Sequence, residues 1–461
     1  MKKLTFKQVA PFLVLAAVAI GALFVTPVAD FADATKYNGA DTAWIIVATA
    51  LVFLMTPGLA FFYGGMVHRK NVISTMMKSV VAAGVVSVLW VVVGYSLCFG
   101  KSIGGFIGDP TTHLFFKGVN SGEPWSLAPT IPKTLFSLFQ LMFAVITPGL
   151  VVGAVAERIR FTSYILFTAL FSILVYAPLA HMSWHPDGFL FKMGALDFAG
   201  GTVVHISAGC AALAGALVLK RRQSHLEHKE IPPANIPYVL IGTGLLWFGW
   251  FGFNAGSALG ANALSVSAFA TTNTAAAAAG LSWMFFDVVR GKKPSVIGFC
   301  VGAVVGLVAI TPAAGFVAIP QSIFIGAVAA LISNVVVYYK QKSTLDDTLD
   351  VFPCHGIGGM VGMLMTGIFA TKAVNSAGND GLFYGNAAFF LTQLKAMAIA
   401  VAYSFTVSFL IFKFINFILP LRVTSEEEAM GLDASQHNEN YVQGTLLVKS
   451  NGLMKEELIE D

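Results

Sequence analysis

The chain has 461 residues, of which 56% are hydrophobic and 11% are charged, and its mean hydropathy is +0.75. Soluble domains carry about 25% charged residues, so this composition excludes an ordinary soluble domain and indicates a membrane protein. The net charge of +4 does not indicate a nucleic-acid partner, because the basic residues lie between apolar segments. No polar stretch is long enough for a second folded domain, and no phosphate-loop motif indicates an ATP-driven pump. We predict one membrane domain that is not an enzyme.

The N-terminal segment has the pattern of an export signal. A lysine-containing start precedes an apolar run over residues 9–25, and small residues near Ala29 or Ala34 provide candidate cleavage sites. We predict that residues 1–34 are a signal peptide that is removed. The alternative is a retained twelfth span.

Eleven apolar stretches follow, each close to the roughly 20 residues that a helix needs to cross about 30 Å of hydrocarbon. We predict an all-α membrane domain over residues 35–420 with eleven transmembrane helices, followed by a cytoplasmic tail over residues 421–461. The predicted spans are residues 41–65, 74–99, 133–156, 161–182, 199–219, 238–256, 267–289, 295–312, 321–340, 351–370 and 389–416.

Basic residues are concentrated in alternate loops. The positive-inside rule places these loops in the cytoplasm, so we expect the N-terminus outside, the C-terminus inside, and a multi-pass protein of the cell inner (cytoplasmic) membrane. The basic set is Arg69, Lys70, Arg158, Arg160, Lys220, Arg221, Arg222, Lys229, Arg290, Lys292, Lys293, Lys340 and Lys342.

The odd number of spans favours two inverted five-helix repeats plus one additional C-terminal helix. In transporters of this design the substrate path lies between the two halves. The fifth span holds His205 and the tenth holds His355, and each of these spans is preceded by an acidic residue, Asp197 or Asp350. The sequence symmetry between the two halves is slight, but it indicates His205 and His355 as one candidate site.

An ionisable side chain inside an apolar span is costly and indicates a function by default. The alternative for His205 and His355 is a structural hydrogen bond between helices. Glycines lie near both histidines, among them Gly209 and Gly359, and small residues let membrane helices approach closely. We therefore expect the two imidazoles to lie side by side.

Several ordered motifs resemble those of ammonium transporters of the Amt family. They are TPGLAFFYGG at 56–65, AERIRF at 156–161, GALDFAGGTVVHI at 194–206, WFGFNAGSA at 250–258, DVFPCHG at 350–356 and GGMVG at 358–362. The resemblance extends from about Asp41 to Tyr441. It implies eleven helices in two inverted halves and a homotrimer with one pore in each subunit.

Carried over position by position, the resemblance implies a transport path with neither a cofactor nor a bound metal. Asp197 is expected to be buried near the external mouth in a structural role. The path residues are Phe139, Trp184 and Ser257 in the outer vestibule as the substrate-binding set, Phe143 and Phe253 as the gate, and His205 and His355 lining the pore.

These residue types suit ammonium chemically. Aromatic rings attract a cation by about 0.5–2 kcal/mol each, and a serine hydroxyl accepts one of its hydrogen bonds. Potassium is similar in size and charge, but an apolar pore cannot replace its water shell. Ammonium loses a proton and crosses as ammonia, which two imidazoles can hydrogen-bond while relaying a proton. Methylammonium is the expected substrate analogue.

Three other functions are compatible with parts of the sequence. A transition-metal ion transporter would use His205, His355 and Cys354 as ligands, although no acidic ligand accompanies them in the spans. An ammonium sensor would use the same fold, and a Rh-type gas channel would lack the Trp184 and Ser257 pair.

The resemblance also implies a cytoplasmic partner, the signalling protein PII, in addition to membrane lipid. PII would dock on the loop over residues 220–237 and on the tail through Tyr441. The tail departs from the family pattern at Asn438, where glycine is common, and residues 442–461 extend past the usual end.

Overall fold

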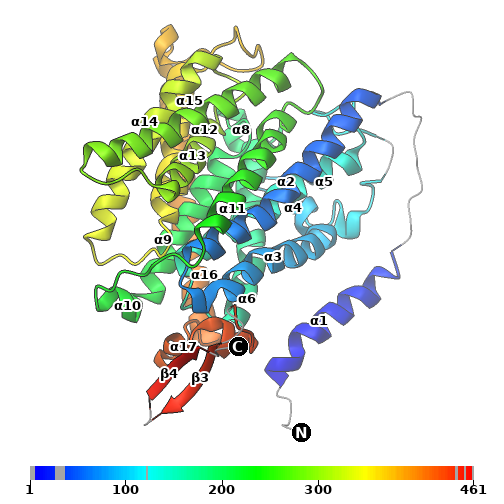
Figure 1. Ribbon diagram of the computed structural model, residues 1–461. Helices are drawn as coiled ribbons and strands as arrows, with labels where there is room; N and C mark the ends of the chain where they lie inside the picture. The colour runs from blue at the N-terminus through cyan, green and yellow to red at the C-terminus, as the bar shows by residue number, and fades with distance from the viewer. Residues whose placement is uncertain (1–5, 26–36, 121–122, 442–444, 451–452, 459–461) are drawn as a thin grey trace.

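The computed structural model describes residues 6–25, 37–120, 123–441, 445–450 and 453–458, which form a bundle of long helices (Figure 1). The principal helices are α1 (Phe6–Ala22), α2 (Gly39–Met66), α3 (Val72–Leu89), α5 (Lys133–Val155), α6 (Phe161–Phe171), α7 (Ala177–Trp184), α9 (Ser207–Leu219), α11 (Ile236–Trp250), α12 (Ala263–Val289), α13 (Val296–Ile310), α14 (Ile319–Gln341), α15 (Gly358–Phe369) and α16 (Ala387–Ile418).

Shorter elements complete and extend these helices. Short π-helical turns, which are wider than α-helix, join α3 to α4 and α6 to α7. Turns of the same kind lie at the start of the helices that contain α9 and α15. The shorter elements are η2 (Arg69–Asn71), η3 (Trp90–Gly94), α4 (Tyr95–Phe99), η4 (Leu114–Phe116), η5 (Ser172–Tyr176), α8 (Phe189–Lys192), η6 (Gly201–Ile206), α10 (Gln223–Leu226), η7 (Phe251–Ala255), η8 (Phe352–Ile357), η9 (Leu382–Tyr384), α17 (Ser425–Met430) and η10 (Asp433–His437).

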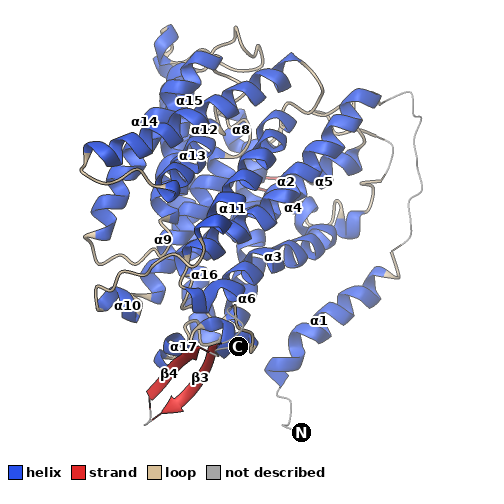
Figure 2. Cartoon of the chain, viewed as in Figure 1, coloured by secondary structure: helices blue, strands red, loops and turns tan. Residues whose placement is uncertain are grey.

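The predicted all-α class holds for the membrane domain. Two short antiparallel pairs of strands accompany it, β1 (Ser102–Ile103) with β2 (Ile107–Gly108) and β3 (Thr445–Ser450) with β4 (Leu453–Leu458). Figure 2 shows helices throughout the bundle and the β3–β4 hairpin at one end of it, beside α17. Part of the predicted cytoplasmic tail is therefore a hairpin.

Within the described part of the chain, nine helical runs are long and apolar enough to cross a membrane. Helices α12 and α13 lie over the two remaining predicted spans, 267–289 and 295–312, without meeting the same length and hydropathy limits. The multi-pass character is therefore established, and the number eleven remains a prediction. The nine runs are Gly39–Met66, Arg69–Phe99, Lys133–Val155, Phe161–Lys192, Gly201–Leu219, Ile236–Ala255, Ile319–Gln341, Phe352–Phe369 and Ala387–Ile418.

Helix packing is similar in the two halves of the bundle. Helix α5 packs on α2, α3 and α9 in the first half, and α13 packs on α11, α12 and α15 in the second. Helices α3 and α6 are in contact, as are α12 and α14. These shared contacts are compatible with two five-helix repeats, which remain a prediction.

The two halves approach closely where α9 crosses η8. A side chain at Gly209 would collide with the backbone of Gly356, and a side chain at Gly359 would press on Ile206 and His205. Both glycines lie four residues after a histidine, one turn further along the helix. The small residues expected from the sequence thus allow the histidine-bearing helices to touch.

The segment after α16 is folded against the bundle. The carboxylate of Asp433 accepts hydrogen bonds from the backbone N–H groups of Ser74 (2.7 Å) and Ile73 (3.1 Å), which caps the start of α3. Asn438 has φ +55°, a left-handed conformation that glycine adopts freely and asparagine tolerates. The unusual residue at this position is therefore compatible with the backbone that it must adopt.

Helix α1 lies apart from the bundle (Figure 1). It falls within the predicted signal peptide and most of its apolar side chains are exposed. The candidate cleavage sites near Ala29 and Ala34 lie outside the described residues.

Candidate functional site

Two carboxylates cap the short helical turns that carry the histidines. Asp197 accepts hydrogen bonds from the backbone N–H groups of Gly200 (2.9 Å), Gly201 (2.6 Å) and Thr202 (2.8 Å), and also from the Thr202 hydroxyl. The first N–H groups of a helix have no partner inside the helix, and no water is available inside an apolar bundle to replace one. Asp197 therefore fixes where η6, and with it His205, begins.

The second carboxylate is that of Asp347. The sequence suggested Asp350 as the counterpart of Asp197 before the second histidine, and this suggestion is wrong. Asp347 accepts hydrogen bonds from the backbone N–H groups of Val351 (3.0 Å) and Phe352 (2.7 Å) at the start of η8. Asp350 instead forms an ion pair with Lys340 (2.7 Å). Asp197 and Asp347 each precede a histidine by eight residues, a shared spacing that the sequence contained.

The two histidines meet inside the bundle. Their Nδ1 atoms are 3.4 Å apart, their ring centroids 5.4 Å apart, and their planes 27° from parallel. His205 is 1% and His355 is 4% exposed. In a hydrogen bond between two Nδ1 atoms, one nitrogen donates and the other accepts. One imidazole therefore carries its proton on Nδ1, and the other, when neutral, carries it on Nε2.

A continuous row of aromatic rings leads to this pair. The centroids of Trp184 and Phe143 are 5.9 Å apart at an interplanar angle of 81°, and those of Phe143 and Phe253 are 4.2 Å apart at 39°. The ring of His205 lies 6.0 Å from Phe253. The indole Nε1–H of Trp184 donates to the backbone carbonyl of Asp197 (3.1 Å), so the first helix cap and the first ring of the row are connected.

A cavity of about 180 Å³ lies on the Trp184 side of the row. Trp184, Phe143, Asp197 and Ser257 line it. Phe139 does not: its side chain is fully buried, 4.9 Å from the ring of Phe143 and against Gly256. Four of the expected residues thus share one cavity, while Phe139 supports the Phe143 ring from within the protein.

The Ser257 hydroxyl donates its proton to the backbone carbonyl of Phe253 (2.8 Å). Because that proton is committed, the oxygen presents lone pairs and acts as an acceptor towards a ligand in the cavity.

A second cavity of only about 10 Å³ lies beyond the Phe143–Phe253 contact. It is about large enough for one water-sized molecule. His205 and His355 line it together with apolar and aromatic side chains, including Phe253 and Trp250. The two imidazoles are therefore the main polar groups that a small molecule meets there.

Trp250 is a site residue that the sequence analysis did not single out. Its ring is stacked on His205 at 5.3 Å and 22°, and its Nε1–H donates to the Thr311 hydroxyl (2.9 Å). Trp250 stands at the start of the motif at 250–258, but stacking across two helices leaves no periodic signal in the sequence. Its place against His205 limits the tilt of that imidazole.

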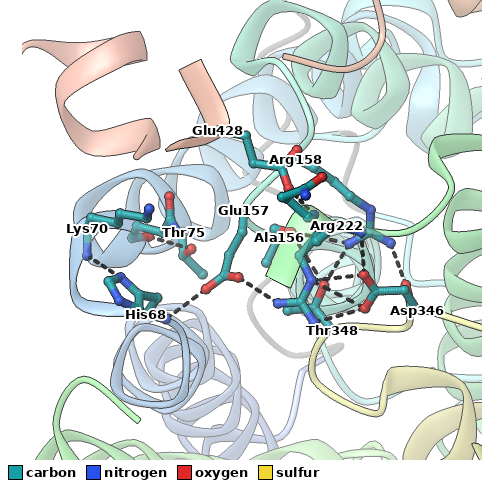
Figure 3. Close-up of polar contacts among 12 residues, drawn as sticks. His68, Lys70, Thr75, Ala156, Glu157, Arg158, Arg222, Asp346, Thr348 and Glu428 are labelled. Carbon is teal, nitrogen blue, oxygen red and sulfur yellow. Dashed lines mark hydrogen bonds and ion pairs between the residues drawn. The ribbon is translucent and has the colours of Figure 1, made fainter. Parts of the chain in front are cut away.

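At the other end of the bundle a charged network ties four loops together (Figure 3). Arg222 lies between Glu157 (2.6 Å) and Asp346 (2.8 Å), and its backbone N–H also donates to Asp346. Glu157 accepts from the backbone N–H of His68 (2.7 Å), and Arg158 donates to Thr348 (2.7 Å). Asp346 directly precedes Asp347, so the network holds the segment that caps η8.

Electrostatics in this network follow from burial and pairing. Burial alone would raise the pKa of Asp346, but its hydrogen bonds with Arg222 and the charges of Arg158 and Arg222 hold that pKa below the ordinary value. Burial, which is only partly offset by neighbouring carboxylates, lowers the pKa of Arg158 to about 10. Burial also raises the pKa of Asp347.

The tail contacts the same network. Arg160 forms two hydrogen bonds with the Glu427 carboxylate, 3.0 and 2.5 Å, and Glu428 accepts from the backbone N–H of Gln223 (2.8 Å). Two polar cavities of about 400 and 240 Å³ lie here and share Glu157 and Arg222 in their linings. In the described ranges, no group of three or more His, Cys, Asp or Glu residues is arranged to hold a metal ion.

Comparisons with known proteins agree with one another. A family model described as Ammonium Transporter Family matches residues 43–442. An ammonium transporter of Bacillus subtilis is 47% identical over 409 residues, which cover 88% of this chain and 99% of the relative. The crystal structure of Saccharomyces cerevisiae Mep2 is similar with a TM-score of 0.80 at 35% identity, covering 85% of this chain and 89% of that one. A solved sensor Amt protein has a TM-score of 0.78 at 30% identity, covering 86% and 98%.

We predict that Arg222→Gln strongly destabilises the protein, since it leaves Glu157 and Asp346 buried without their cation. Breaking such a pair costs roughly 3–5 kcal/mol. With its pKa held low, Asp346 stabilises the fold above its unfolded-state pKa, and this contribution is lost as the pH falls through the folded-state value. The variant, in which that pKa rises, should therefore unfold at a higher pH than the wild type.

Thermal unfolding of the purified protein between about pH 3 and 7 measures this effect. Lys229→Gln in the same loop is the matched control, because Lys229 forms an exposed ion pair with Glu227 and exposed pairs contribute little. Equal unfolding temperatures for wild type and Arg222→Gln would contradict the prediction.

Proposed function

The chain belongs to the ammonium transporter family, a family of membrane transporters and not of enzymes. From this we propose that it takes up ammonium across the cytoplasmic membrane by binding the cation, removing a proton and passing ammonia through a pore at His205 and His355. The observation that carries the proposal is the contact of these two imidazoles in a small apolar cavity directly beyond a pair of phenyl rings.

Recognition of ammonium takes place in the 180 Å³ cavity. The π faces of Trp184 and Phe143 attract a cation, and the Ser257 oxygen accepts one of its N–H groups, because the hydroxyl proton is held by Phe253. We assign Asp197 a structural role, since its oxygens are occupied by the amides of η6.

The gate consists of Phe143 and Phe253. With their centroids 4.2 Å apart, these rings leave no room for a hydrated ion and supply no carbonyl oxygens in place of water. Potassium is therefore excluded by its dehydration cost. Ammonium avoids the same cost by giving up a proton, and neutral ammonia then passes the closely packed rings when they move apart.

Beyond the gate, ammonia exchanges hydrogen bonds with the two imidazoles. The contact between their Nδ1 atoms makes one imidazole the donor and the other the acceptor. The arrangement reverses when a proton arrives at the bare Nε2 of the donor, the shared proton moves to the acceptor, and the acceptor releases the proton on its own Nε2. This reversal provides a route by which the proton released from ammonium can follow the ammonia. Trp250 holds one ring of the pair in place.

The alternatives fit this geometry less well. A transition-metal ion would need several ligands at once. The Nδ1 atoms are engaged with each other, which leaves the lone pair of a single Nε2, and among the described residues no group of three or more His, Cys, Asp or Glu is arranged around it. An ammonium sensor on the same fold would bind the cation without moving charge, and a Rh-type gas channel would not use Trp184 and Ser257 for binding. Measurement of transport current separates these possibilities.

The assembly that we propose is a homotrimer of eleven-span subunits in the cell inner membrane, with the C-terminus in the cytoplasm. Cytoplasmic placement of the tail is supported by the basic residues at its end of the bundle, including Arg160 and Arg222. The cytoplasmic partner is PII, docked over the 220–237 loop and the tail.

We expect His205→Leu to abolish or sharply reduce the current driven by ammonium in reconstituted vesicles, because the proton relay loses one of its two members. His355→Leu should do the same, and the double variant should be no worse than additive, since residues that act as one unit are coupled. Discrimination against potassium is measured on the same vesicles.

His228→Gln, an exposed histidine in a loop, serves as the control and should leave the current unchanged. Undiminished current in both leucine variants, shown to be folded, would return the histidines to a structural role. Ammonium binding by the wild type without any current would favour the sensor, and competition by zinc would favour a metal-ion transporter.

Trp184→Leu should weaken the apparent affinity for methylammonium by roughly 2- to 30-fold, the equivalent of the 0.5–2 kcal/mol of one cation–π contact. Trp184→Phe keeps a π face but loses the hydrogen bond to Asp197, so it separates cation binding from packing. Identical concentration dependence in the wild type and both variants would remove Trp184 from the binding site.

Full-length protein should co-purify with PII in at least one nucleotide or 2-oxoglutarate state. Lys220→Glu together with Lys229→Glu, in the exposed part of the proposed docking loop, should reduce the amount recovered, because both substitutions reverse a surface charge. Failure of the wild type to retain PII in every state would exclude this partner.

A further inference from the structure

One side chain of α16 holds part of the wall of the larger aromatic cavity. The Oε1 atom of Gln393 accepts a hydrogen bond from the backbone N–H of Leu196 (2.8 Å), and its Nε2 atom donates to the carbonyl of the same residue (2.8 Å). Residues 195–197 belong to no helix or strand, so no regular pattern of hydrogen bonds fixes their backbone. The Gln393 amide supplies the hydrogen bonds that Leu196 needs there.

The segment held in this way faces the cavity. Leu196, Asp197 and Phe198 are consecutive and all three line it. The carbonyl of Asp197 accepts the indole N–H of Trp184, and its carboxylate caps η6. Because Asp197 directly follows the residue that Gln393 holds, the direction of its carbonyl depends on how the Leu196 backbone is placed.

Gln393 is held in turn by the other half of the bundle. Its side chain is fully buried. A Cβ atom at Gly367 of α15 would lie only 3.1 Å from the Cβ atom of Gln393, so this glycine makes room for the amide. Helix α15 continues from η8, which carries His355, and α16 packs on both α9 and α15. The amide therefore connects the segment before His205 to the helix that follows His355.

The hydrogen bonds of Gln393 suit a role in orientation better than one in packing. A buried amide is unfavourable unless its donor and its acceptor are both paired. Both are paired here with the same backbone residue, and two contacts with one residue fix its orientation as well as its position. An apolar side chain of the same length would fill the space without fixing the peptide.

We propose that Gln393 is a positioning residue for the cation site, because through Leu196 it holds the Asp197 carbonyl where the Trp184 indole binds it. The cavity lining does not include Gln393, so the effect on the cation is indirect. Helix α16 is the additional helix outside the two predicted repeats, and the proposal gives it a part in recognition. The inference rests on the proposed function, since it concerns how ammonium is recognised.

The concentration dependence of radiolabelled methylammonium uptake into vesicles tests the inference. Gln393→Met keeps the length of the side chain and removes both hydrogen bonds. It should weaken the apparent affinity by as much as the roughly 2- to 30-fold expected for loss of the Trp184 contact. A merely structural role would instead lower maximal uptake, through loss of folded protein, at unchanged affinity.

Ser408→Ala is the matched control. Ser408 is a buried residue of the same helix, and its hydroxyl has no hydrogen-bond partner among the described residues. The substitution should therefore leave the apparent affinity unchanged.

Coupling between Gln393 and Trp184 distinguishes positioning from packing. Residues that act through one network have effects that do not add. In a Trp184→Leu background, Gln393→Met should therefore cause little further loss of affinity, whereas the two effects would add if Gln393 acted elsewhere.

Gln393→Glu is the conservative variant, and it also serves if the methionine variant does not fold. A protonated carboxylic acid offers one donor and one acceptor, as the amide does, whereas a carboxylate offers acceptors only. Relative to the wild type at the same pH, the affinity of this variant should recover as the pH is lowered from about 8 to about 5.

The outcomes separate this inference from the proposed function. Wild-type affinity in folded Gln393→Met, full additivity with Trp184→Leu, or a Gln393→Glu variant that is no closer to the wild type at about pH 5 than Gln393→Met would each overturn the inference alone. Absence of saturable methylammonium uptake by the wild type would overturn the proposed function and the inference with it.

Discussion

The arrangement of the site depends on how the first amides of two membrane helices are satisfied away from water. An unpaired N–H group inside an apolar bundle is too costly to leave, and Asp197 and Asp347 supply the acceptors. Each carboxylate fixes the residue at which its helix begins, and each histidine follows eight residues later. The imidazoles are thereby placed at the same distance in sequence from the two helix caps.

The imidazoles meet only because the two helices that carry them also come close. Gly209 and Gly356 remove the side chains at the crossing, and both histidines lie in the wider helical turns η6 and η8 rather than in regular α-helix. Such turns are uncommon, and they are frequent at functional sites. Close packing of the backbones and the looser turns together bring the Nδ1 atoms within hydrogen-bonding distance.

The sequence was informative where hydropathy or a motif determines the answer. Helices lie over all eleven predicted spans, because apolar length alone identifies such segments. The sequence did not predict the role of a residue correctly where that role depends on contacts between helices. Asp350 lies closer to His355 in sequence, but only the fold reveals that Asp350 binds Lys340 and that Asp347 caps η8. The position of Phe139 outside the cavity lining and the stacking of Trp250 on His205 were not predicted for the same reason, since burial and stacking have no period in the sequence.

The two helix caps resemble each other in geometry but differ in surroundings. Asp197 is next to the aromatic vestibule, where its backbone carbonyl holds Trp184. Asp347 directly follows Asp346, which is held by Arg222. The backbone N–H of Gln223, next to Arg222, donates to Glu428 of the tail. The aromatic rings are therefore connected to His205 through Asp197, whereas the loops and the tail are connected to His355 through Asp347. The hydrogen bond between the imidazoles joins these two sets of contacts.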